Sequence, residues 1–327
     1  QTLIAFDWSD STDAVSGVSN YDLQVSTDGT FNYVSYSSSP VTSQATLTVV
    51  DGVYYWRVRA KDNAGNYSAY SSTRSLTVDT NEPDSVITAP ITQTAYNTLT
   101  LIQGTADDGA GSGVDKLELS IRDLTLGATY WNGSAWQDGE IWVDIGSVGW
   151  SYNFSNSDWT DGHQYSIQSR AVDIASNTQS AVAVSSFTFD ISKPTSAVTY
   201  PVESANYVDV TSITGTSADA VSGVSEVQTQ VKGNVNGEYL YLQEDIASWG
   251  ASAVWIVTTG TNNWSLNTAS VSWSTGTYYI WSKATDNAGN WETPVTSITF
   301  SIVFSTPDAP GGFSGTAESA SSIKWSW

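Results

Sequence analysis

Residues 52–66 read GVYYWRVRAKDNAGN, in which a segment of alternating side chains runs directly into a turn-forming sequence. From Tyr54 to Ala60, aromatic or apolar side chains stand at the even positions, while Arg57 and Arg59 stand at odd ones. Successive side chains of a β-strand point to opposite faces, so the pattern predicts a half-buried strand. In the DNAGN that follows, Asp and Asn side chains can bond to the nearby backbone, and Gly accepts a positive φ. The stretch therefore predicts a strand and the hairpin turn that ends it.

The same turn returns twice, as AVDIASN at residues 171–177 and as ATDNAGN at residues 284–290. Each repeated Asp has a Tyr eight residues before it and a Pro 21 residues after it, and a Ser-Gly-Val motif recurs upstream. The aligned positions are Tyr54, Asp62 and Pro83, then Tyr165, Asp173 and Pro194, then Tyr278, Asp286 and Pro307. Such constant spacing indicates tandem repeats of about 111 residues.

Short alternating segments fill each repeat, among them TLIAFDW at residues 2–8, KLELSI at residues 116–121 and SSFTFD at residues 185–190. Gly, Asn, Asp and Ser clusters separate them, and no stretch carries a convincing helical stripe. Many short strands in a unit near 100 residues are typical of a β-sandwich. The repeated Tyr is expected to be the tyrosine corner of such a sandwich, its hydroxyl bonded back to the chain.

Three pairs of segments carry a resemblance to a known family. FDWSDSTDAVSGVSNYDLQVS at residues 6–26, with residues 52–66, resembles fibronectin type III repeats. GTADDGAGSGVDKLELSI at residues 104–121 and GTSADAVSGVSEVQTQV at residues 215–231, each with its own repeated turn, resemble the bacterial immunoglobulin-like repeats of large secreted adhesins. The resemblance implies an all-β protein of tandem Ig-like and fibronectin type III β-sandwiches arranged end to end.

The repeats set the expected domain limits. Residues 1–82 are expected to form a fibronectin type III-like domain that lacks its N-terminal strand, and residues 83–193 and 194–306 two bacterial Ig-like domains. PDAPGGFSGTAESASSIKWSW, residues 307–327, resembles the truncated start of a further fibronectin type III-like domain. Because the chain opens inside one predicted strand and stops in another, we expect an excerpt of a longer polypeptide whose neighbouring domains are its first partners.

Composition narrows the function. The chain has 33 acidic and 11 basic residues, a net charge of −22, which opposes binding to nucleic acid and to anionic membranes. It contains no cysteine, so disulfides and thiol chemistry are excluded. No run of about 18 apolar residues and no basic start before an apolar stretch is present, so the segment has no predicted membrane span or signal peptide. The composition and the resemblance together indicate an extracellular, cell-surface protein.

Acidic residues gather at the expected junctions between domains. In a fibronectin-like sandwich, the DNAGN loop and the loop before Ser-Gly-Val emerge at the same end, which also receives the chain from the preceding repeat. Ca²⁺ takes six to eight oxygen ligands from carboxylates, carbonyls and water. The candidate calcium ligands are Asp79, Glu82, Asp107, Asp108 and Asp173 at the first junction, and Asp190, Asp219 and Asp286 at the second.

The resemblance implies Ca²⁺ at such junctions, where it would relieve repulsion and fix the angle between domains. The alternative is that these acids only stabilise turns, since acidic loops are common in any acidic protein. At the third junction, Val303 stands where Asp79 and Asp190 stand at the others, and Asp308 is the nearest substitute.

The second and third repeats each contain roughly 15 to 18 residues more than the first between Ser-Gly-Val and the repeated Asp, and this insertion is rich in Trp. An exposed row of aromatic rings can stack on sugars, and Trp131, Trp136, Trp249 and Trp255 are the candidate carbohydrate-binding residues. The alternative is that the rings pack across strands and over the sandwich.

We expect no enzyme. The only histidine, His163, lies in the turn-rich TDGHQY and has no counterpart in the other repeats, so we expect it to be an exposed turn residue and not a catalytic base. The favoured function is an extracellular structural or adhesive repeat region of a larger surface protein or filament, with self-assembly or surface glycans as further partners. The alternative is an accessory carbohydrate-binding module, and a third hypothesis is the noncatalytic tail of a secreted enzyme.

Overall fold

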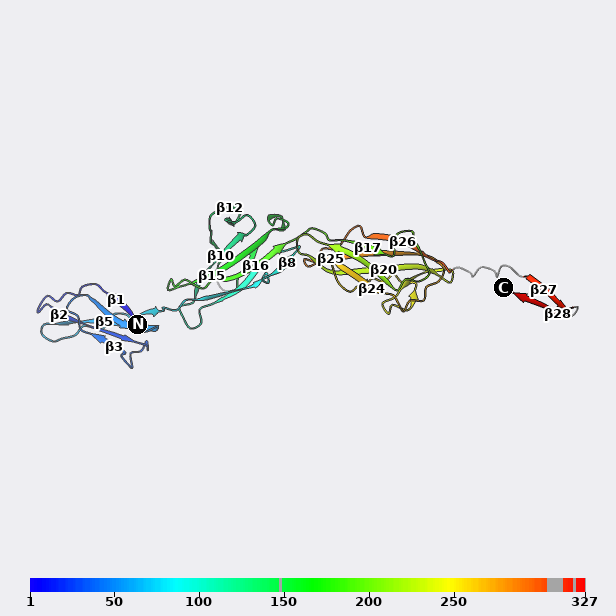
Figure 1. Ribbon diagram of the computed structural model, residues 1–327. Helices are drawn as coiled ribbons and strands as arrows, with labels where there is room; N and C mark the ends of the chain where they lie inside the picture. Colours follow the sequence, from blue (N-terminus) through cyan, green and yellow to red (C-terminus); the bar gives the residue numbers. More distant parts are fainter. Residues whose placement is uncertain (147–148, 305–313, 320–321, 327) are drawn as a thin grey trace. The chain divides into compact units, whose positions relative to one another are not determined.

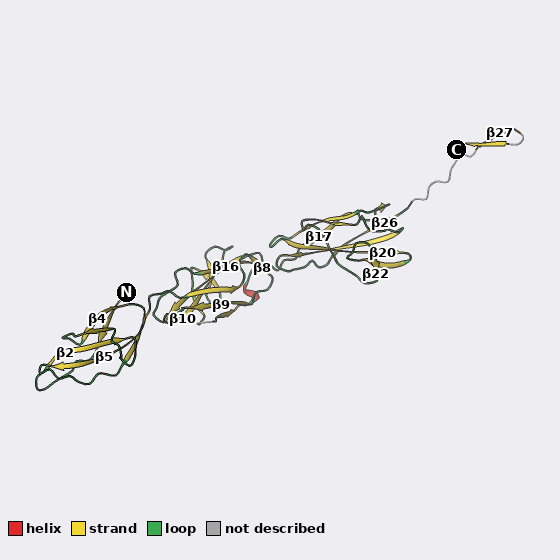
Figure 2. Cartoon of the chain, turned by 90° about the horizontal axis from the view of Figure 1, so that it is seen from below, coloured by secondary structure: helices red, strands yellow, loops and turns green. Residues whose placement is uncertain are grey.

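The computed structural model describes residues 1–146, 149–304, 314–319 and 322–326, which form β-strands, turns and loops (Figure 1). Within these residues the one helix is a short 3₁₀ turn at Asn156–Asp158, drawn red in Figure 2. None of the described segments forms a helix long and apolar enough to cross a membrane. The predicted all-β class is confirmed.

The first repeat is a sandwich of two sheets around one core. A four-stranded sheet has the order β3-β2-β5-β6, and a two-stranded sheet pairs β1 with β4. The strands are β1 (Thr2–Asp7), β2 (Val18–Ser26), β3 (Tyr36–Ser38), β4 (Gln44–Val49), β5 (Gly52–Asp62) and β6 (Arg74–Val78). Phe6 from β1, Leu23 from β2 and Val58 from β5 are buried in the core, so both sheets contribute to it.

The second repeat adds strands to this plan. A three-stranded sheet has the order β14-β9-β7, and a seven-stranded sheet has the order β12-β11-β10-β15-β16-β8, with β13 also paired to β10. The strands are β7 (Asp84–Ala89), β8 (Thr94–Tyr96), β9 (Leu101–Asp107), β10 (Val114–Asp123), β11 (Thr129–Trp131), β12 (Trp136–Asp138), β13 (Val143–Asp144), β14 (Ser151–Asn153), β15 (Gln164–Asp173) and β16 (Ala183–Phe189). The Trp-rich insertion supplies β11, β12 and β13.

The third repeat has the same arrangement. Its sheets have the orders β17-β19-β24 and β18-β26-β25-β20-β21-β22, with β23 also paired to β20. The strands are β17 (Thr195–Tyr200), β18 (Asn206–Tyr207), β19 (Ser212–Ala218), β20 (Val224–Val235), β21 (Glu238–Leu242), β22 (Trp249–Gly250), β23 (Ile256–Val257), β24 (Asn263–Asn267), β25 (Gly276–Asp286) and β26 (Thr296–Ile302). Further along the chain, β27 (Ser314–Ser319) pairs with β28 (Ser322–Ser326).

The two sequence motifs are hydrogen-bonded partners in every repeat. The strand after Ser-Gly pairs with the strand that ends at the repeated Asp, so Val18 faces Asp62, Val114 faces Asp173 and Val224 faces Asp286. In all three pairs the register shifts directly after this Val. A β-bulge at the same place in each repeat turns the strand end and the loop before it toward the DNAGN turn.

The repeated tyrosines occupy corner positions, as predicted. The Tyr54 hydroxyl donates to the Val50 carbonyl at 3.0 Å, and the Tyr278 hydroxyl donates to the Ser274 carbonyl at 2.9 Å. The Tyr165 hydroxyl accepts from the Thr160 N–H at 2.8 Å. Each bond reaches back four or five residues and closes the corner that leads into the strand.

Contacts divide the chain into two compact units, Gln1–Phe189 and Asp190–Trp327. Three separate hydrophobic clusters lie within residues 6–78, 99–189 and 210–302. The domain limits predicted after residues 82, 193 and 306 stay predictions, as does the end-to-end arrangement. Asp308 and most of the predicted link after residue 304 lie outside the described residues.

Candidate metal centres

Three aspartates from distant parts of the sequence gather at one end of the second repeat. Asp79 follows β6, Asp108 follows β9, and Asp173 is the last residue of β15. One carboxylate oxygen from each lies within 4.8 Å of the other two. We call these residues the first carboxylate cluster.

Backbone N–H groups hold this cluster in place. The Asp79 carboxylate accepts from Ser112 N at 2.6 Å and from Asn81 N at 3.1 Å, and Asp108 Oδ2 accepts from Gly113 N at 2.7 Å. Asp173 Oδ1 accepts from the backbone N–H of Asn177 at 2.7 Å. Hydrogen bonds to the ionised carboxylate lower its pKa, and the bond from Ser112 is the largest cause of the lowered pKa of Asp79.

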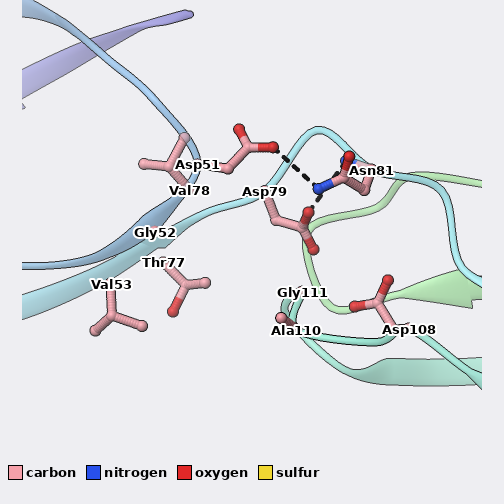
Figure 3. Close-up of a pocket in the computed structure, with 10 residues that line it drawn as sticks. All are labelled: Asp51, Gly52, Val53, Thr77, Val78, Asp79, Asn81, Asp108, Ala110 and Gly111. Atoms are coloured by element: carbon pink, nitrogen blue, oxygen red, sulfur yellow. Dashed lines mark hydrogen bonds between the residues drawn. The ribbon is translucent and has the colours of Figure 1, made fainter.

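A glycine allows the close approach of two of these carboxylates. A Cβ on Gly111 would lie 2.5 Å from Asp108 Oδ2 and 2.6 Å from Asp79 Oδ2. Figure 3 shows Asp79 and Asp108 on different chain segments, with Ala110 and Gly111 beside them. The same residues line a cavity of about 410 Å³. The GAGSG sequence is therefore suited to bringing backbone donors and carboxylates together rather than to binding phosphate.

Asp51, in the turn before β5, is bonded to the chain that carries Asp79. Its carboxylate accepts from the Thr80 hydroxyl at 2.9 Å and from the Asn81 side-chain amide at 3.1 Å. Figure 3 shows the hydrogen bonds from Asn81 to both Asp51 and Asp79. These bonds fix the segment on which Asp79 stands.

The third repeat contains an equivalent set, the second carboxylate cluster. Asp190 precedes β17, Asp219 follows β19, and Asp286 ends β25, and again one oxygen from each lies within 4.8 Å of the others. Asp190 is fully buried and Asp286 is 2% exposed.

Backbone donors surround this second cluster as well. Asp219 Oδ1 accepts from the N–H groups of Ser222 and Gly223 at 2.9 Å each. Asp190 Oδ2 accepts from the same Ser222 N–H at 3.2 Å, and Asp286 Oδ1 accepts from Asn290 N at 2.8 Å. The pKa of Asp190 is raised because burial disfavours its charge and because Asp219 and Asp286 repel it, although a hydrogen bond from Ser222 opposes both effects.

Both clusters contain a buried oxygen that lacks a protein partner within the described residues. These atoms are Asp108 Oδ1 in the first cluster and Asp219 Oδ2 in the second, and the hydroxyl of Ser222 shares this property. A buried carboxylate oxygen without a hydrogen bond or a counter-ion is costly. A cation bound among the three carboxylates would satisfy it, so the residues present fit a cation that prefers oxygen ligands.

Six of the eight predicted ligands lie in the two carboxylate clusters, three in each, whereas Glu82 and Asp107 lie elsewhere. The Glu82 carboxylate accepts from the Ser180 N–H at 2.8 Å and from its hydroxyl at 2.7 Å. Asp107 lies on the exposed face of β9, and its carboxylate accepts from Gly109 N at 3.1 Å.

The first repeat holds an incomplete version of the same arrangement. Asp13 accepts from Ser16 N at 2.7 Å and Gly17 N at 2.9 Å, and Asp62 accepts from Asn66 N at 2.7 Å. Among the described residues, no third acidic side chain joins these two in a group of the kind seen in the later repeats.

The Asn that ends the repeated turn, Asn177 or Asn290, helps to hold each carboxylate cluster together, a role not predicted from the sequence. The Asn177 amide donates to Asp173 and to the Asp79 carbonyl, and the Asn290 amide donates to Asp286 and to the Asp190 carbonyl. In each case it ties the turn to the segment that carries the first aspartate of the cluster. Its fixed position four residues after the repeated Asp was the available signal.

The Trp-rich insertions mostly pack against the sandwich. Trp131 is 6% exposed, and its indole N–H donates to the Tyr152 hydroxyl at 2.9 Å. The Trp136 indole donates to the Asp158 carbonyl at 2.8 Å, and the Trp249 ring packs edge-on against Trp273. Trp255 lies over the Lys283 ammonium, 4.6 Å from the ring centroid. These positions favour packing for the first three of the four carbohydrate candidates.

No family model matches the chain, and no curated protein matches it either. Among solved structures it is similar to fibronectin(III)-like modules of CbhA from Clostridium thermocellum, at 17% identity and a TM-score of 0.35, over 67% of this chain and 94% of that one. It is also similar to a bacterial ice-binding adhesin, at 14% identity and a TM-score of 0.31, over 88% and 89% of the two chains. A tetra-tandem repeat from the extending region of a large adhesion protein gives 16% identity and a TM-score of 0.31, over 92% and 74%. These structures are modules of the kind the sequence resembles, but at such scores they carry no argument about function.

Proposed function

We propose that this chain is a noncatalytic, extracellular repeat region of a larger surface protein, and that Ca²⁺ bound at the two carboxylate clusters stiffens it. The observation that carries the proposal is the matching pair of buried, unpartnered oxygens, Asp108 Oδ1 and Asp219 Oδ2. They occupy equivalent loops in successive repeats, each beside two further carboxylates. A turn alone does not account for them, because turn formation leaves both atoms without a partner.

The ligand chemistry favours Ca²⁺ over other metals. Each cluster offers only oxygen atoms, and the chain contains no cysteine, so soft metals have no suitable ligands. Ca²⁺ tolerates irregular shells of six to eight oxygens, whereas Mg²⁺ demands a tighter octahedron. The hydroxyl of Ser222 and neighbouring carbonyls are further oxygens available to the second cluster.

The position of each cluster along the chain suggests a mechanical role. Asp79 lies in the segment that joins the first repeat to the second, and Asp190 lies in the segment that joins the second to the third. The other four aspartates belong to the repeat that follows, Asp108 and Asp219 in loops and Asp173 and Asp286 at strand ends. A cation shared by both parts would bind each linking segment to the next repeat, as an adhesive or structural region under tension requires.

Calorimetry with and without chelator tests the proposal. We expect millimolar Ca²⁺ to raise the melting temperature and a chelator to reverse the rise. An ion at a hundred times its dissociation constant adds about 2.7 kcal/mol to the state that binds it. Mg²⁺ should substitute poorly. Identical calorimetric traces with and without chelator would contradict Ca²⁺ binding and would mean that the carboxylates only stabilise turns.

A matched pair of variants separates ion binding from turn formation. Asp219→Asn keeps one oxygen for the N–H groups of Ser222 and Gly223 but removes the second carboxylate oxygen, so it should abolish the Ca²⁺ response of the third repeat. Asp13→Asn makes the same change in the first repeat, where Asp13 accepts from Ser16 and Gly17. This control should leave the Ca²⁺ response unchanged. Equal effects of both variants would contradict a site in the third repeat.

A further inference from the structure

A cavity of about 500 Å³ opens in the third repeat, away from the second carboxylate cluster. Its walls come from three segments: the loop between β21 and β22, the residues around β23, and β24. The residues that matter here are Glu244, Ile246, Trp255, Thr259, Ser265 and Asn267.

The cavity lies where the two sheets of the sandwich part. β23 pairs with β20 in the larger sheet, whereas β24 is the last strand of the smaller sheet. Thr259 and Ser265 join the two sides by exchanging backbone hydrogen bonds of 2.8 and 2.9 Å. These bonds join the two sides of the opening at this one point.

The loop that forms one wall is held in an uncommon backbone conformation. Ile246 has a φ of 53°, a left-handed value that is rare for a β-branched residue. Its N–H donates to the Gln243 carbonyl at 3.0 Å, and its side chain packs against the hydrophobic core. Strained residues of this kind persist only where the surroundings hold them, so the wall has a defined shape.

Several polar groups of the lining have no hydrogen-bonding partner in the part of the chain that the structure describes. They are the Glu244 carboxylate, the Asn267 side-chain nitrogen, the hydroxyls of Thr259 and Ser265, and the indole N–H of Trp255. Glu244, Thr259, Ser265 and Asn267 are exposed and Trp255 is half-buried, so these groups are open to water and to a ligand. Only the Asn267 side-chain oxygen is used, accepting from Ala269 N at 3.0 Å. An aromatic surface with unused donors and acceptors around it is the composition of a polar small-molecule site.

We propose that this cavity binds a neutral saccharide. The Trp255 ring offers an apolar surface for the C–H face of a pyranose, while the carboxylate of Glu244 and the amide of Asn267 are suited to its hydroxyls. Glu244 and the net charge of −22 disfavour acidic sugars. Because the lining shares no residue with either carboxylate cluster, this proposal is independent of the proposed Ca²⁺ binding.

The second repeat supplies a control for the key ring. Trp142 lies over Arg170 at 4.0 Å, as Trp255 lies over Lys283, and both pairs have the same separation of 113 residues from one repeat to the next. Removing either ring uncovers a cation on the larger sheet, so both changes should perturb their repeats similarly.

Saturation-transfer NMR on the whole chain tests the proposal, with methyl glycosides of glucose, galactose, mannose, fucose and N-acetylglucosamine as probes. At least one probe should give a signal that Trp255→Ala abolishes and Trp142→Ala leaves intact. The exposed residues Glu244 and Asn267 allow variants that do not disturb the core, and Glu244→Ala or Asn267→Ala should weaken binding about tenfold. Absence of signal from all five probes, or equal loss in Trp255→Ala and Trp142→Ala, would overturn it. Addition of chelator should not change the result.

Discussion

Gln179 and Glu292 occupy equivalent buried positions in the second and third repeats and make the same contacts with different chemistry. Gln179 Oε1 accepts from Ala171 N at 3.1 Å and from the Ser85 hydroxyl at 2.7 Å. Glu292 Oε2 accepts from Ala284 N at 3.1 Å and from the Ser196 hydroxyl. In the second and third repeats, one side-chain oxygen thus links the repeat's first strand to the strand that ends at the repeated Asp.

The first prediction exchanges these two residues. The Gln179 amide nitrogen donates to Asp84 Oδ1 at 2.8 Å and to the Ala181 carbonyl at 2.9 Å, so Gln179→Glu would place a carboxylate against two acceptors. We expect the free energy of unfolding of this variant to be about 1–3 kcal/mol lower than that of the parent at neutral pH. Part of this loss should be recovered in mild acid, where the new side chain takes up a proton. Glu292→Gln keeps the shared acceptor and should cost far less. Chemical denaturation of both variants at pH 7 and pH 4.5 measures the difference, and equal losses at pH 7 would refute it.

The second prediction concerns the tyrosine corners. Tyr278→Phe removes a buried hydroxyl that both donates to the Ser274 carbonyl and accepts from its N–H. We expect a loss on the order of 1 kcal/mol or more in the third repeat, with the melting of the other repeats nearly unchanged. Tyr165→Phe should do the same in the second repeat. Calorimetry resolves the repeats, and a variant that melts like the parent would mean that the hydroxyl contributes nothing.

Much of the fold was predictable because it depends on short-range patterns. Alternation around Tyr54 identified the strand, and its spacing from Asp62 identified the corner and the turn in all three repeats. The contacts of single side chains were harder to predict. Asp107 and Asp108 are adjacent and look alike in sequence, yet Asp107 stays on the outer face of β9 while Asp108 turns into the cluster.

The remaining misses have similar physical reasons. The unpartnered hydroxyl of Ser222 depends on the fold of its loop, although its place in Ser-Gly-Val marked the loop itself. Four Trp residues looked equivalent as sugar-binding candidates, but Trp131 is enclosed while Trp255 lines a cavity. Which ring faces solvent depends on how the insertion folds over the sheet, and no local pattern encodes that.

The third prediction uses the raised pKa of Asp190. A carboxyl whose pKa is higher in the folded state than in the unfolded state binds its proton more tightly when folded. In chelated protein, its contribution to stability should therefore grow as pH falls through the folded pKa toward 3.8, the ordinary value, and should be lost as pH rises.

Asp190→Asn should raise stability at pH 7 in chelator and flatten the pH dependence of the third repeat. With Ca²⁺ present the same variant should instead destabilise, because it removes a proposed ligand. An identical pH profile for parent and variant in chelator would contradict the raised pKa.

The last prediction concerns how the repeats are arranged and how freely the links between them bend. Three repeats separated by short proline-containing segments should lie end to end, each roughly 35–45 Å long, given strands of about 6–10 residues and a rise of about 3.3 Å per residue. If Asp79 and Asp190 share cations with the loops of the following repeats, Ca²⁺ should restrict the angles at both links, and a chelator should release carboxylates that repel one another. Small-angle scattering should then show an elongated particle whose distribution of shapes broadens on chelation.

The double variant Asp108→Asn and Asp219→Asn should show the broad distribution even in Ca²⁺, while Asp13→Asn should behave like the parent. A compact particle with mutually packed repeats would refute the end-to-end arrangement, and an elongated particle indifferent to chelator would refute only the role of the cation.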